Sequence, residues 1–169
     1  MKNNILKFEE FEFKERVGKG TFGKVFRGIH IESNTICAIK KIRDDDKFRN
    51  SAKKEILVLN DLMKYKENDS CKIINFYGDF MENNIQYLVF EYMDINVYKY
   101  YQNYYSIIKI DTTIDIIYNV CQGLEFIHRK YIHADLKPEN IMFNRETKLA
   151  KIIDLGSAFP KGGEKKHFY

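Results

Sequence analysis

The sequence predicts an α+β fold, in which a five-stranded sheet with one helix is followed by a helical part. The first half contains short runs that alternate apolar and polar residues, which is the period of a half-buried strand. The second half contains apolar residues at helical spacing. The chain has 169 residues, of which 44% are apolar and 31% charged, so it can form a sizeable core.

The first three strands are predicted on either side of a glycine-rich segment. Residues 11–17 alternate apolar and polar side chains, and residues 18–23 interrupt that pattern with three glycines. The alternation resumes at 24–30, and the β-branched segment 35–42 provides the next strand. The glycines are therefore expected to form a loop between two strands.

One helix and two more strands complete this part of the chain. Residues 44–47 are expected to form a solvated loop, and Ser51 is expected to cap a helix that extends to about residue 64. Its apolar residues recur at helical spacing: Ile56, Leu59 and Met63. Segments 73–80 and 85–91 are predicted to be strands joined by a turn around Asn83 and Asn84.

The second half is predicted to be mainly helical. Thr112 and Asp115 fit a capping box, so a helix is expected from there to about residue 130. Its apolar face is expected to comprise Ile117, Val120, Cys121, Leu124 and Ile127. Segments 141–143 and 150–153 are predicted to be short strands around a turn at 144–147. The tyrosines of segment 98–105 are interpreted as positions of another helix, because no arginine stripe supports the alternative of a nucleic-acid stacking platform.

Composition favours an intracellular protein, cytoplasmic or nuclear, without a membrane span. No apolar run is long enough to cross a bilayer, and the N-terminus lacks the pattern of a secretory signal. The three cysteines are widely spaced and follow no metal-ligand pattern, which indicates reduced thiols. The net charge of +4 is too small to indicate a direct nucleic-acid partner.

The glycine segment matches the pattern Gly18-x-Gly20-x-x-Gly23-x-Val25. Glycine allows backbone N–H groups to approach phosphates closely, because no Cβ stands in the way. The pattern alone is equally compatible with an ordinary turn. A dinucleotide-binding fold is disfavoured, because that fingerprint requires a helix after the glycines and a strand is predicted here.

A lysine on the third predicted strand is a candidate phosphate ligand. A lone strand lysine is usually a solvated charge, so Lys40 needs a carboxylate to orient it toward phosphates. Glu55 on the following helix is the candidate, although it is equally compatible with an exposed helix position.

The strongest signal is the run His133-Ala134-Asp135-Leu136-Lys137-Pro138-Glu139-Asn140, followed by Asp154-Leu155-Gly156. Asp135 can accept a hydroxyl proton, and Lys137 can neutralise a phosphoryl group. Asn140 and Asp154 can bind a metal ion. His133 is expected to be a packed residue that holds the loop. This set of groups predicts phosphoryl transfer.

These motifs, in this order, resemble those of eukaryotic protein kinases of the serine/threonine type. The resemblance implies an N-terminal extension at 1–10 and a kinase domain at 11–169, with an N-lobe at 11–90, a hinge at 91–93 and part of a C-lobe at 94–169. It also implies an antiparallel sheet in the N-lobe, ATP and Mg²⁺ as cofactors, and protein substrates.

The resemblance assigns a role to each motif residue. Asp135 and Lys137 are expected to be catalytic, and Asn140 and Asp154 are expected to bind metal. The residues expected to bind ATP are Val17, Gly18, Lys19, Gly20, Thr21, Phe22, Gly23, Lys24, Val25, Ala38, Lys40, Glu55, Glu91, Met93 and Met142.

A narrower resemblance concerns the dual-specificity tyrosine-regulated kinases and the related splicing-factor kinases. It is carried by segments 88–91, 96–98, 133–140 and 154–158. Ala134 departs from the arginine of most kinases and Leu155 from the usual phenylalanine. Since the chain ends at Tyr169, we expect an incomplete helical lobe. This leaves two alternatives: a catalytically incompetent kinase that binds nucleotide or a partner, and a small-molecule kinase.

Overall fold

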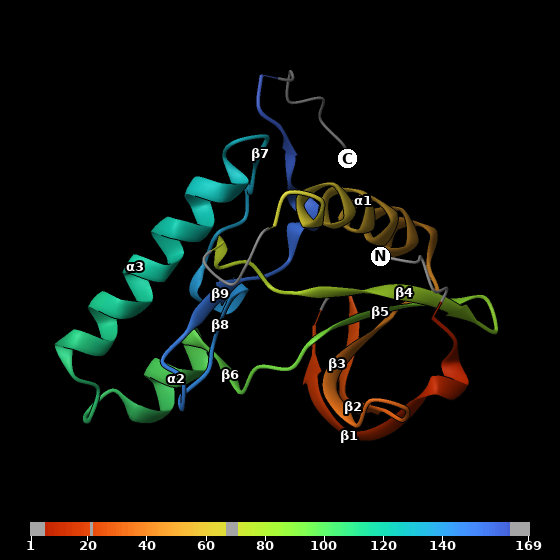
Figure 1. Cartoon of the computed structure of the whole chain (residues 1–169), viewed down its shortest axis with the longest axis horizontal. Helices are drawn as coiled ribbons and strands as arrows, with labels where there is room; N and C mark the ends of the chain where they lie inside the picture. The colour runs from red at the N-terminus through yellow and green to blue at the C-terminus, as the bar shows by residue number, and fades with distance from the viewer. Residues whose placement is uncertain (1–5, 21, 67–70, 163–169) are drawn as a thin grey trace. The chain divides into compact units, whose positions relative to one another are not determined.

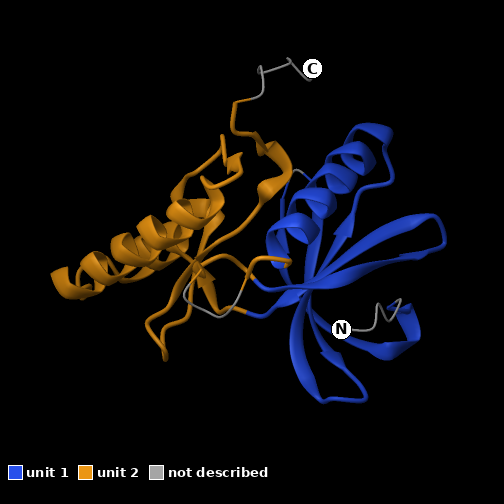
Figure 2. Cartoon of the chain, turned by 45° about the horizontal axis from the view of Figure 1, so that its top comes forward, with its two compact units in different colours: residues 1–63, 75–92 blue, residues 64–74, 93–169 orange. Residues whose placement is uncertain are grey.

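The computed structural model describes residues 6–20, 22–66 and 71–162, which fall into two compact units (Figure 2). Unit 1 comprises residues 1–63 and 75–92, and unit 2 comprises residues 64–74 and 93–169. Thr21, which was expected to bind ATP, lies outside the described residues.

Unit 1 contains the predicted five-stranded antiparallel sheet (Figure 1). Its strands are β1 (Phe11–Lys19), β2 (Gly23–His30), β3 (Thr35–Ile42), β4 (Phe76–Glu82) and β5 (Ile85–Glu91), in the order β1-β2-β3-β5-β4. A 3-10 turn, η1 (Phe8–Glu10), precedes the sheet. The predicted sheet is confirmed, and the bounds of β3 and β5 agree with those expected from the sequence.

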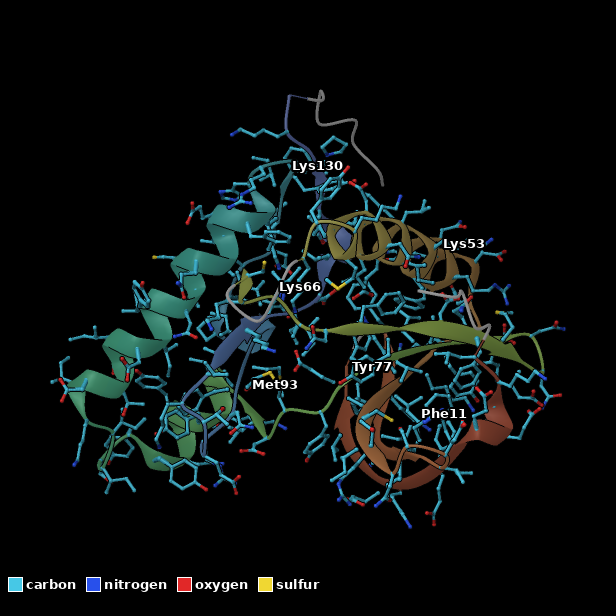
Figure 3. The ribbon with its side chains drawn as sticks, in the orientation of Figure 1. Phe11, Lys53, Lys66, Tyr77, Met93 and Lys130 are labelled. Atoms are coloured by element: carbon cyan, nitrogen blue, oxygen red, sulfur yellow. The ribbon has the colours of Figure 1, made fainter. Side chains whose placement is uncertain are left out.

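An aromatic core covers one face of this sheet. Phe80 stacks between Phe11 and Tyr87, with ring centroids 5.5 Å and 5.0 Å away. Cys37 and Val89 are buried in the same cluster (Phe11 is labelled in Figure 3). Each large apolar side chain buried in this way contributes about 1.5–3 kcal/mol, so this cluster is a main source of stability for unit 1.

The helix of unit 1, α1 (Asp46–Met63), begins earlier than predicted. Ser51 lies inside the helix, so the expectation that it caps the helix was wrong. Asp45 takes that position: its Oδ1 accepts a hydrogen bond from the Lys47 N–H at 2.9 Å, and its carbonyl accepts one from the Arg49 N–H at 2.9 Å. Of the expected loop at 44–47, residues 44–45 precede the helix and residues 46–47 are its first turn.

The fourth strand begins later than predicted, at Phe76. Ile73 instead forms a parallel bridge with Ile152 within unit 2. Asn83 and Asn84 form the expected turn between β4 and β5, with φ angles of 49° and 61°. Positive φ at two consecutive residues is typical of tight hairpin turns, and asparagine tolerates it better than most residues.

Unit 2 combines two helices with short strands. Its elements are β6 (Ile95–Asn96), α2 (Val97–Tyr104), α3 (Ile110–Ile127), β7 (Tyr131–Ile132), η3 (Pro138–Asn140), β8 (Ile141–Phe143), β9 (Ala150–Ile152), η4 (Leu155–Ser157) and β10 (Phe159–Pro160). Strands β6, β8 and β9 form one sheet, and β7 pairs with β10. The tyrosine-rich segment is helical, as expected, and the Tyr100 ring packs on Phe143 at 4.8 Å.

Helix α3 differs from the prediction at its beginning and on its apolar face. Lys109 is the N-cap, and Thr112 lies inside the helix, so no capping box forms there. Ile117 and Cys121 are exposed rather than packed in the core. Gly123 is buried instead. A Cβ at this position would lie 2.8 Å from the Lys72 carbonyl oxygen. The backbone of α3 therefore lies close to neighbouring backbone at this point.

An open apolar hollow explains the exposed residues of α3. Within unit 2 it has a volume of about 540 Å³ and is lined by α2, α3 and the loop before β8, including Tyr101, Ile117 and Cys121. Three residues of the predicted apolar face, Ile117, Val120 and Cys121, thus border this hollow, whereas Ile127 is buried as expected. In the described part of the chain, no helix is both long and apolar enough to cross a membrane.

Candidate active site

The buried ion pair of unit 1 joins Lys40 on β3 to Glu55 on α1. The Lys40 Nζ lies 2.8 Å from Glu55 Oε2, and the two side chains are 16% and 5% exposed. Burial removes most of the solvent that would otherwise screen the pair, so the carboxylate fixes the position of the ammonium group. The Lys40 Nζ also lies 5.5 Å from the centroid of the Phe22 ring.

The glycine loop closes a hairpin between β1 and β2. The register pairs Gly18 with Val25 and Lys19 with Lys24, and the Gly20 N–H donates to the Gly23 carbonyl at 2.9 Å. The sequence therefore builds a short loop between two strands, as a phosphate-cradling loop requires.

The glycines at the two ends of this loop differ in their surroundings. A Cβ on Gly23 would lie 2.0 Å from the Lys41 carbonyl oxygen, so this glycine is required by the close approach of β2 to β3. A Cβ on Gly20 would meet no atom of the described chain within 4 Å. Packing within the protein therefore explains Gly23, whereas Gly20 leaves open space beside the loop.

Several residues expected to contact the base lie on the same face of the sheet as Lys40. Val25 is the register partner of Lys40, and Ala38 lies two residues before Lys40 on β3. Alternation along a strand places both on the Lys40 face. Val17 near the end of β1 is exposed, and Lys24 points to the opposite face by the same alternation.

Glu91 at the end of β5 is held by Asn75. The Glu91 N–H donates to the Asn75 carbonyl at 3.0 Å, and Glu91 Oε1 accepts from the Asn75 N–H at 2.7 Å. The amide of Glu91 is thus occupied. Two further expected base contacts belong to unit 2: Met93, which is buried (Figure 3), and Met142, which is half-buried on β8.

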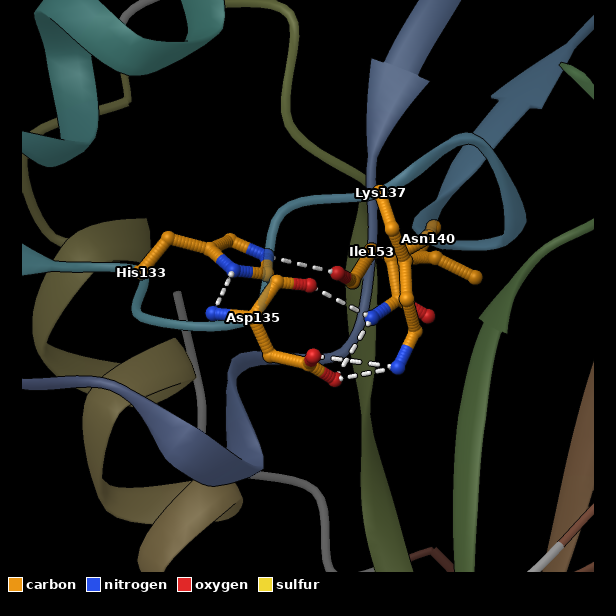
Figure 4. A network of polar contacts seen from close by, with 5 residues as sticks. All are labelled: His133, Asp135, Lys137, Asn140 and Ile153. Atoms are coloured by element: carbon orange, nitrogen blue, oxygen red, sulfur yellow. Dashed lines mark hydrogen bonds and ion pairs between the residues drawn. The ribbon is translucent and has the colours of Figure 1, made fainter.

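The acidic group of unit 2 is Asp135, whose carboxylate is held by two neighbours on the same loop (Figure 4). The Lys137 Nζ donates to both carboxylate oxygens, at 3.0 Å and 2.8 Å. The Asn140 Nδ2 donates to the Asp135 carbonyl at 2.9 Å and to Oδ2 at 3.1 Å. Since Asn140 is buried while Asp135 is only half-buried, the asparagine anchors an acid that solvent can still reach.

The loop is held on the interior side by His133. Its Nδ1 lies 3.3 Å from the Asp135 N–H, which can only donate, so this nitrogen is the acceptor. Nε2, at 3.0 Å from the Ile153 carbonyl oxygen, therefore carries the proton and donates. The residue is 1% exposed, and both ring nitrogens are engaged with backbone. This geometry suits the expected holding role and leaves the ring no free nitrogen for acid–base work.

The pKa of Lys137 is shifted by its neighbours on this loop. Its hydrogen bond to Asp135 raises the pKa of the Lys137 ammonium above its usual value, with smaller contributions from the charges of Asp135, Glu139 and Asp154. The ammonium is therefore fully charged at neutral pH. It places a cation beside the Asp135 carboxylate. A transferring phosphoryl group would need such a cation to offset its negative charge.

The remaining acid, Asp154, follows β9 in a left-handed backbone conformation, with φ 61° and ψ 74°. Asn140 and Asp154 supply oxygen donors, which Mg²⁺ prefers. Within the described ranges, no group of three or more His, Cys, Asp and Glu side chains could hold a metal ion on its own. That donor set fits Mg²⁺, because Mg²⁺ commonly takes one or two protein ligands together with substrate phosphates and water.

Two contacts of the site were missed from the sequence. Asn140 was expected to bind metal, and its bond to the Asp135 carboxylate was not foreseen. Asn75 was not considered, although it fixes both the amide and the side chain of Glu91. No sequence pattern reveals the Asn75 contact, whereas the η3 turn at Pro138–Asn140 was signalled by the proline and brings Asn140 back toward Asp135.

Comparisons with known proteins agree with this geometry. Residues 11–167 match the family model for the protein kinase domain. The chain is 33% identical to cyclin-dependent kinase B2-1 of Arabidopsis thaliana, with 91% of this chain and 51% of the relative covered. It is 34% identical to cyclin-dependent kinase B2-2 of the same plant, with 94% and 54% covered. A probable dual specificity protein kinase of Caenorhabditis elegans, madd-3, is 32% identical, with 85% and 16% covered.

The chain thus spans about half the length of the plant relatives that it matches.

Proposed function

This chain belongs to the protein kinase family, and from that premise we propose that it transfers the γ-phosphate of Mg-ATP to serine or threonine hydroxyls of proteins. The observation that carries the proposal is the Asp135 carboxylate, anchored by buried Asn140 and paired with Lys137. The match to the protein kinase family model and the kinase relatives support this class of reaction.

In the proposed reaction, Asp135 acts on the incoming hydroxyl. The hydroxyl oxygen forms a bond to the γ-phosphorus while the bond from that phosphorus to the β–γ bridging oxygen breaks. The hydroxyl proton passes to Asp135, and ADP is the leaving group. Lys137, which here donates to both Asp135 oxygens, would donate to the transferred phosphoryl oxygens instead.

The nucleotide would be held mainly by the residues of unit 1. We assign the α- and β-phosphates to Lys40, because Glu55 fixes its ammonium group. Backbone N–H groups of the glycine loop would contact the phosphates, and Val25, Ala38 and Met142 would contact the base. At Glu91 we assign the carbonyl to the base edge, since the amide is already bonded to Asn75.

Asn140 and Asp154 would hold Mg²⁺. When bound, the ion neutralises charge on the phosphates. Asn140 is suited to this task because its Nδ2 is bonded to Asp135, which leaves the amide oxygen as its remaining acceptor. Asn140 would therefore connect the metal ion to Asp135, the proposed general base.

The choice between hydroxyl types is a finer part of the proposal. Lys137 favours serine and threonine, because tyrosine kinases lack a lysine at this position of the loop. We also propose membership of the dual-specificity and splicing-factor branch, for which the name of the nematode relative is one support. Ala134 has a φ of 65°, which disfavours a bulky side chain, and no phosphate would be recognised through this position.

A second candidate function is a nucleotide- or partner-binding module without phosphate transfer. The observation that favours it is the pair of hydrogen bonds that the Lys137 Nζ donates to Asp135, one to each carboxylate oxygen of the proposed base. Under this alternative, Mg-ATP binds through Lys40 but Asp135 never takes up a proton.

The test is phosphate incorporation from Mg-ATP into a mixed library of serine, threonine and tyrosine peptides. Asp135→Asn should lower incorporation about 10²–10⁴-fold, as expected for loss of a general base. Lys40→Met should also abolish it, whereas Asp111→Asn, at an exposed position of α3, should have no effect. ATP binding without any incorporation, in a folded sample, would favour the binding module. Incorporation that survives Asp135→Asn would reject the proposed base.

A further inference from the structure

Three lysines lie side by side across unit 1, on strands β1, β2 and β3. The register pairs Lys19 with Lys24, and Lys24 with Lys41. Directly opposed residues of antiparallel strands have Cβ atoms about 4.5–5.5 Å apart, and like charges at that distance repel each other. The lysine row is therefore unfavourable for the sheet itself, which suggests that an anion stabilises it.

The lysine row faces away from the ion pair between Lys40 and Glu55. Consecutive strand residues point to opposite faces, so Lys41 leaves the sheet on the side opposite to Lys40. Two contacts agree with this: Lys40 reaches Glu55 on α1, while the Lys41 Nζ lies 5.8 Å from the Tyr87 ring centroid. The row is thus separate from the proposed phosphate contacts of Lys40.

The row borders a hollow that a fourth cation joins. The hollow has a volume of about 230 Å³ and is lined by Lys19, Gly23, Lys24, Lys41, Ile42, Arg43, Asp44 and Ile85. Arg43 rests on the Phe48 ring, with 5.4 Å between the guanidinium carbon and the ring centroid. Asp44 is the acid among the described lining residues, and its charge is offset in part by an ion pair with Arg49, which also pairs with Asp46. The hollow is therefore strongly cationic.

We propose that this hollow binds a phosphorylated side chain of a peptide or protein partner. Lysine and arginine side chains together can give a phosphate several charge-assisted hydrogen bonds. The hollow is large enough to admit a phosphate group, and Ile85 offers apolar contact to a neighbouring residue of the peptide.

The lining disfavours two other polyanions. Single-stranded nucleic acid binds by stacking its bases on aromatic side chains, and none of the described residues that line this hollow is aromatic. Anionic lipid headgroups also bind clusters of basic residues, but a flat bilayer surface would not fill a hollow. A phosphopeptide fits the observed combination better than either. The proposal goes beyond phosphate transfer, and its test requires none.

The test is fluorescence anisotropy of a labelled hexapeptide that contains one phosphoserine among alanine and glycine. The purified 169-residue chain is titrated at about 50 mM salt, where surface charges act over roughly 14 Å, with saturating Mg-ADP present throughout. The double substitution Lys41→Gln and Arg43→Gln should weaken binding about tenfold or more, because two charged donors are lost. The unphosphorylated peptide should not bind.

A matched control removes the same charge elsewhere. Lys99→Gln with Arg129→Gln, both exposed positions of unit 2, should change the affinity less than about twofold. Loss of a charge from the self-repelling row should leave the thermal midpoint unchanged or raised, so the Lys41 and Arg43 variant is expected to remain folded. Equal weakening by both double variants would overturn the proposal, because binding would then reflect net charge alone.

The same measurement separates the other polyanions. A labelled single-stranded DNA hexamer or anionic phospholipid vesicles that bind more tightly than the phosphopeptide, and lose that binding in the Lys41 and Arg43 variant, would overturn the peptide assignment. If the unsubstituted chain binds the phosphopeptide but transfers no phosphate from Mg-ATP, the proposed function is rejected and this proposal stands.

Discussion

Lys40 and Lys41 are consecutive residues of β3, yet they belong to different chemical environments. Lys40 is bound to the buried Glu55 carboxylate at 2.8 Å, whereas Lys41 joins a row of lysines on the opposite face. The alternation of a strand thus places two consecutive lysines on opposite faces of the sheet. Substitutions of the two residues should have separable effects.

The ion pair between Lys40 and Glu55 should be strongly coupled. A double-mutant cycle with Lys40→Met and Glu55→Gln is expected to give a coupling free energy of about 1–3 kcal/mol, because each single change leaves the other group buried without its partner. Urea unfolding measures it. The exposed pair of Lys14 and Glu12 is the control, and the same cycle there should give about 0–1 kcal/mol. Equal coupling in both pairs would contradict this prediction.

Substitution by alanine should affect a different property at each end of the loop: stability at Gly23 and nucleotide binding at Gly20. Gly23→Ala should lower the free energy of unfolding by about 1–3 kcal/mol, because its Cβ would clash with the Lys41 carbonyl. Gly20→Ala should leave unfolding almost unchanged, because its Cβ would meet no described atom within 4 Å, but it should weaken Mg-ATP binding if the phosphates bind beside this loop as proposed. Thermal unfolding and nucleotide titration distinguish the two effects. A stability loss at Gly20 equal to that at Gly23 would reject the distinction.

Asn140→Asp should change the pH dependence of phosphate transfer. The new carboxylate would lie near Asp135 Oδ2, which is 3.1 Å from Asn140 Nδ2 in this structure. Two adjacent carboxylates hold a shared proton more tightly, so the acid limb of the pH–rate profile should move upward by about one unit or more. Asn140→Ala is the control, because it removes the amide without adding charge. It should lower the rate and move the limb less than Asn140→Asp, because it removes one donor to Asp135 but adds no negative charge.

Cys37 should make stability depend on alkaline pH. Burial raises the pKa of the Cys37 thiol from 9.0 to about 11. The unfolded chain therefore loses this proton at lower pH than the folded chain, and stability should fall as pH rises from 9.0 toward 11. Unfolding midpoints across that range test it, with Cys37→Ala as the comparison. A slope unchanged by that substitution would contradict the assignment.

Local patterns predicted the sheet well because its boundaries are encoded locally. The β-branched residues of β3 are Thr35, Ile36, Ile39 and Ile42, and the paired asparagines mark the end of β4 and the beginning of β5. Helix α1 began earlier than expected because Asp45 offered an earlier cap than Ser51. On α3, the apolar stripe was visible, but a pattern of apolar residues does not reveal that Ile117 borders an open hollow.

The candidate site was only partly accessible from sequence. Residue types and their order indicated which groups carry charge, such as Asp135 and Lys137. The hydrogen bond from Asn140 to Asp135 depends on the path of the loop. Pro138 signals the turn at its end, but no sequence pattern indicates the positive φ of Ala134 at its beginning. The lysine row depends on register, because Lys19, Lys24 and Lys41 are neighbours only once three strands are aligned.

The turn at Asn83 and Asn84 has a consequence for tolerated sequence variation. Both residues are exposed, so solvent accessibility alone would predict that almost any side chain is accepted there. Their positive φ angles impose a different rule, because most L-residues pay about 1–2 kcal/mol in that conformation. In a saturation library selected for folded protein, these surface positions should therefore be enriched in glycine, asparagine and aspartate and depleted of valine and isoleucine.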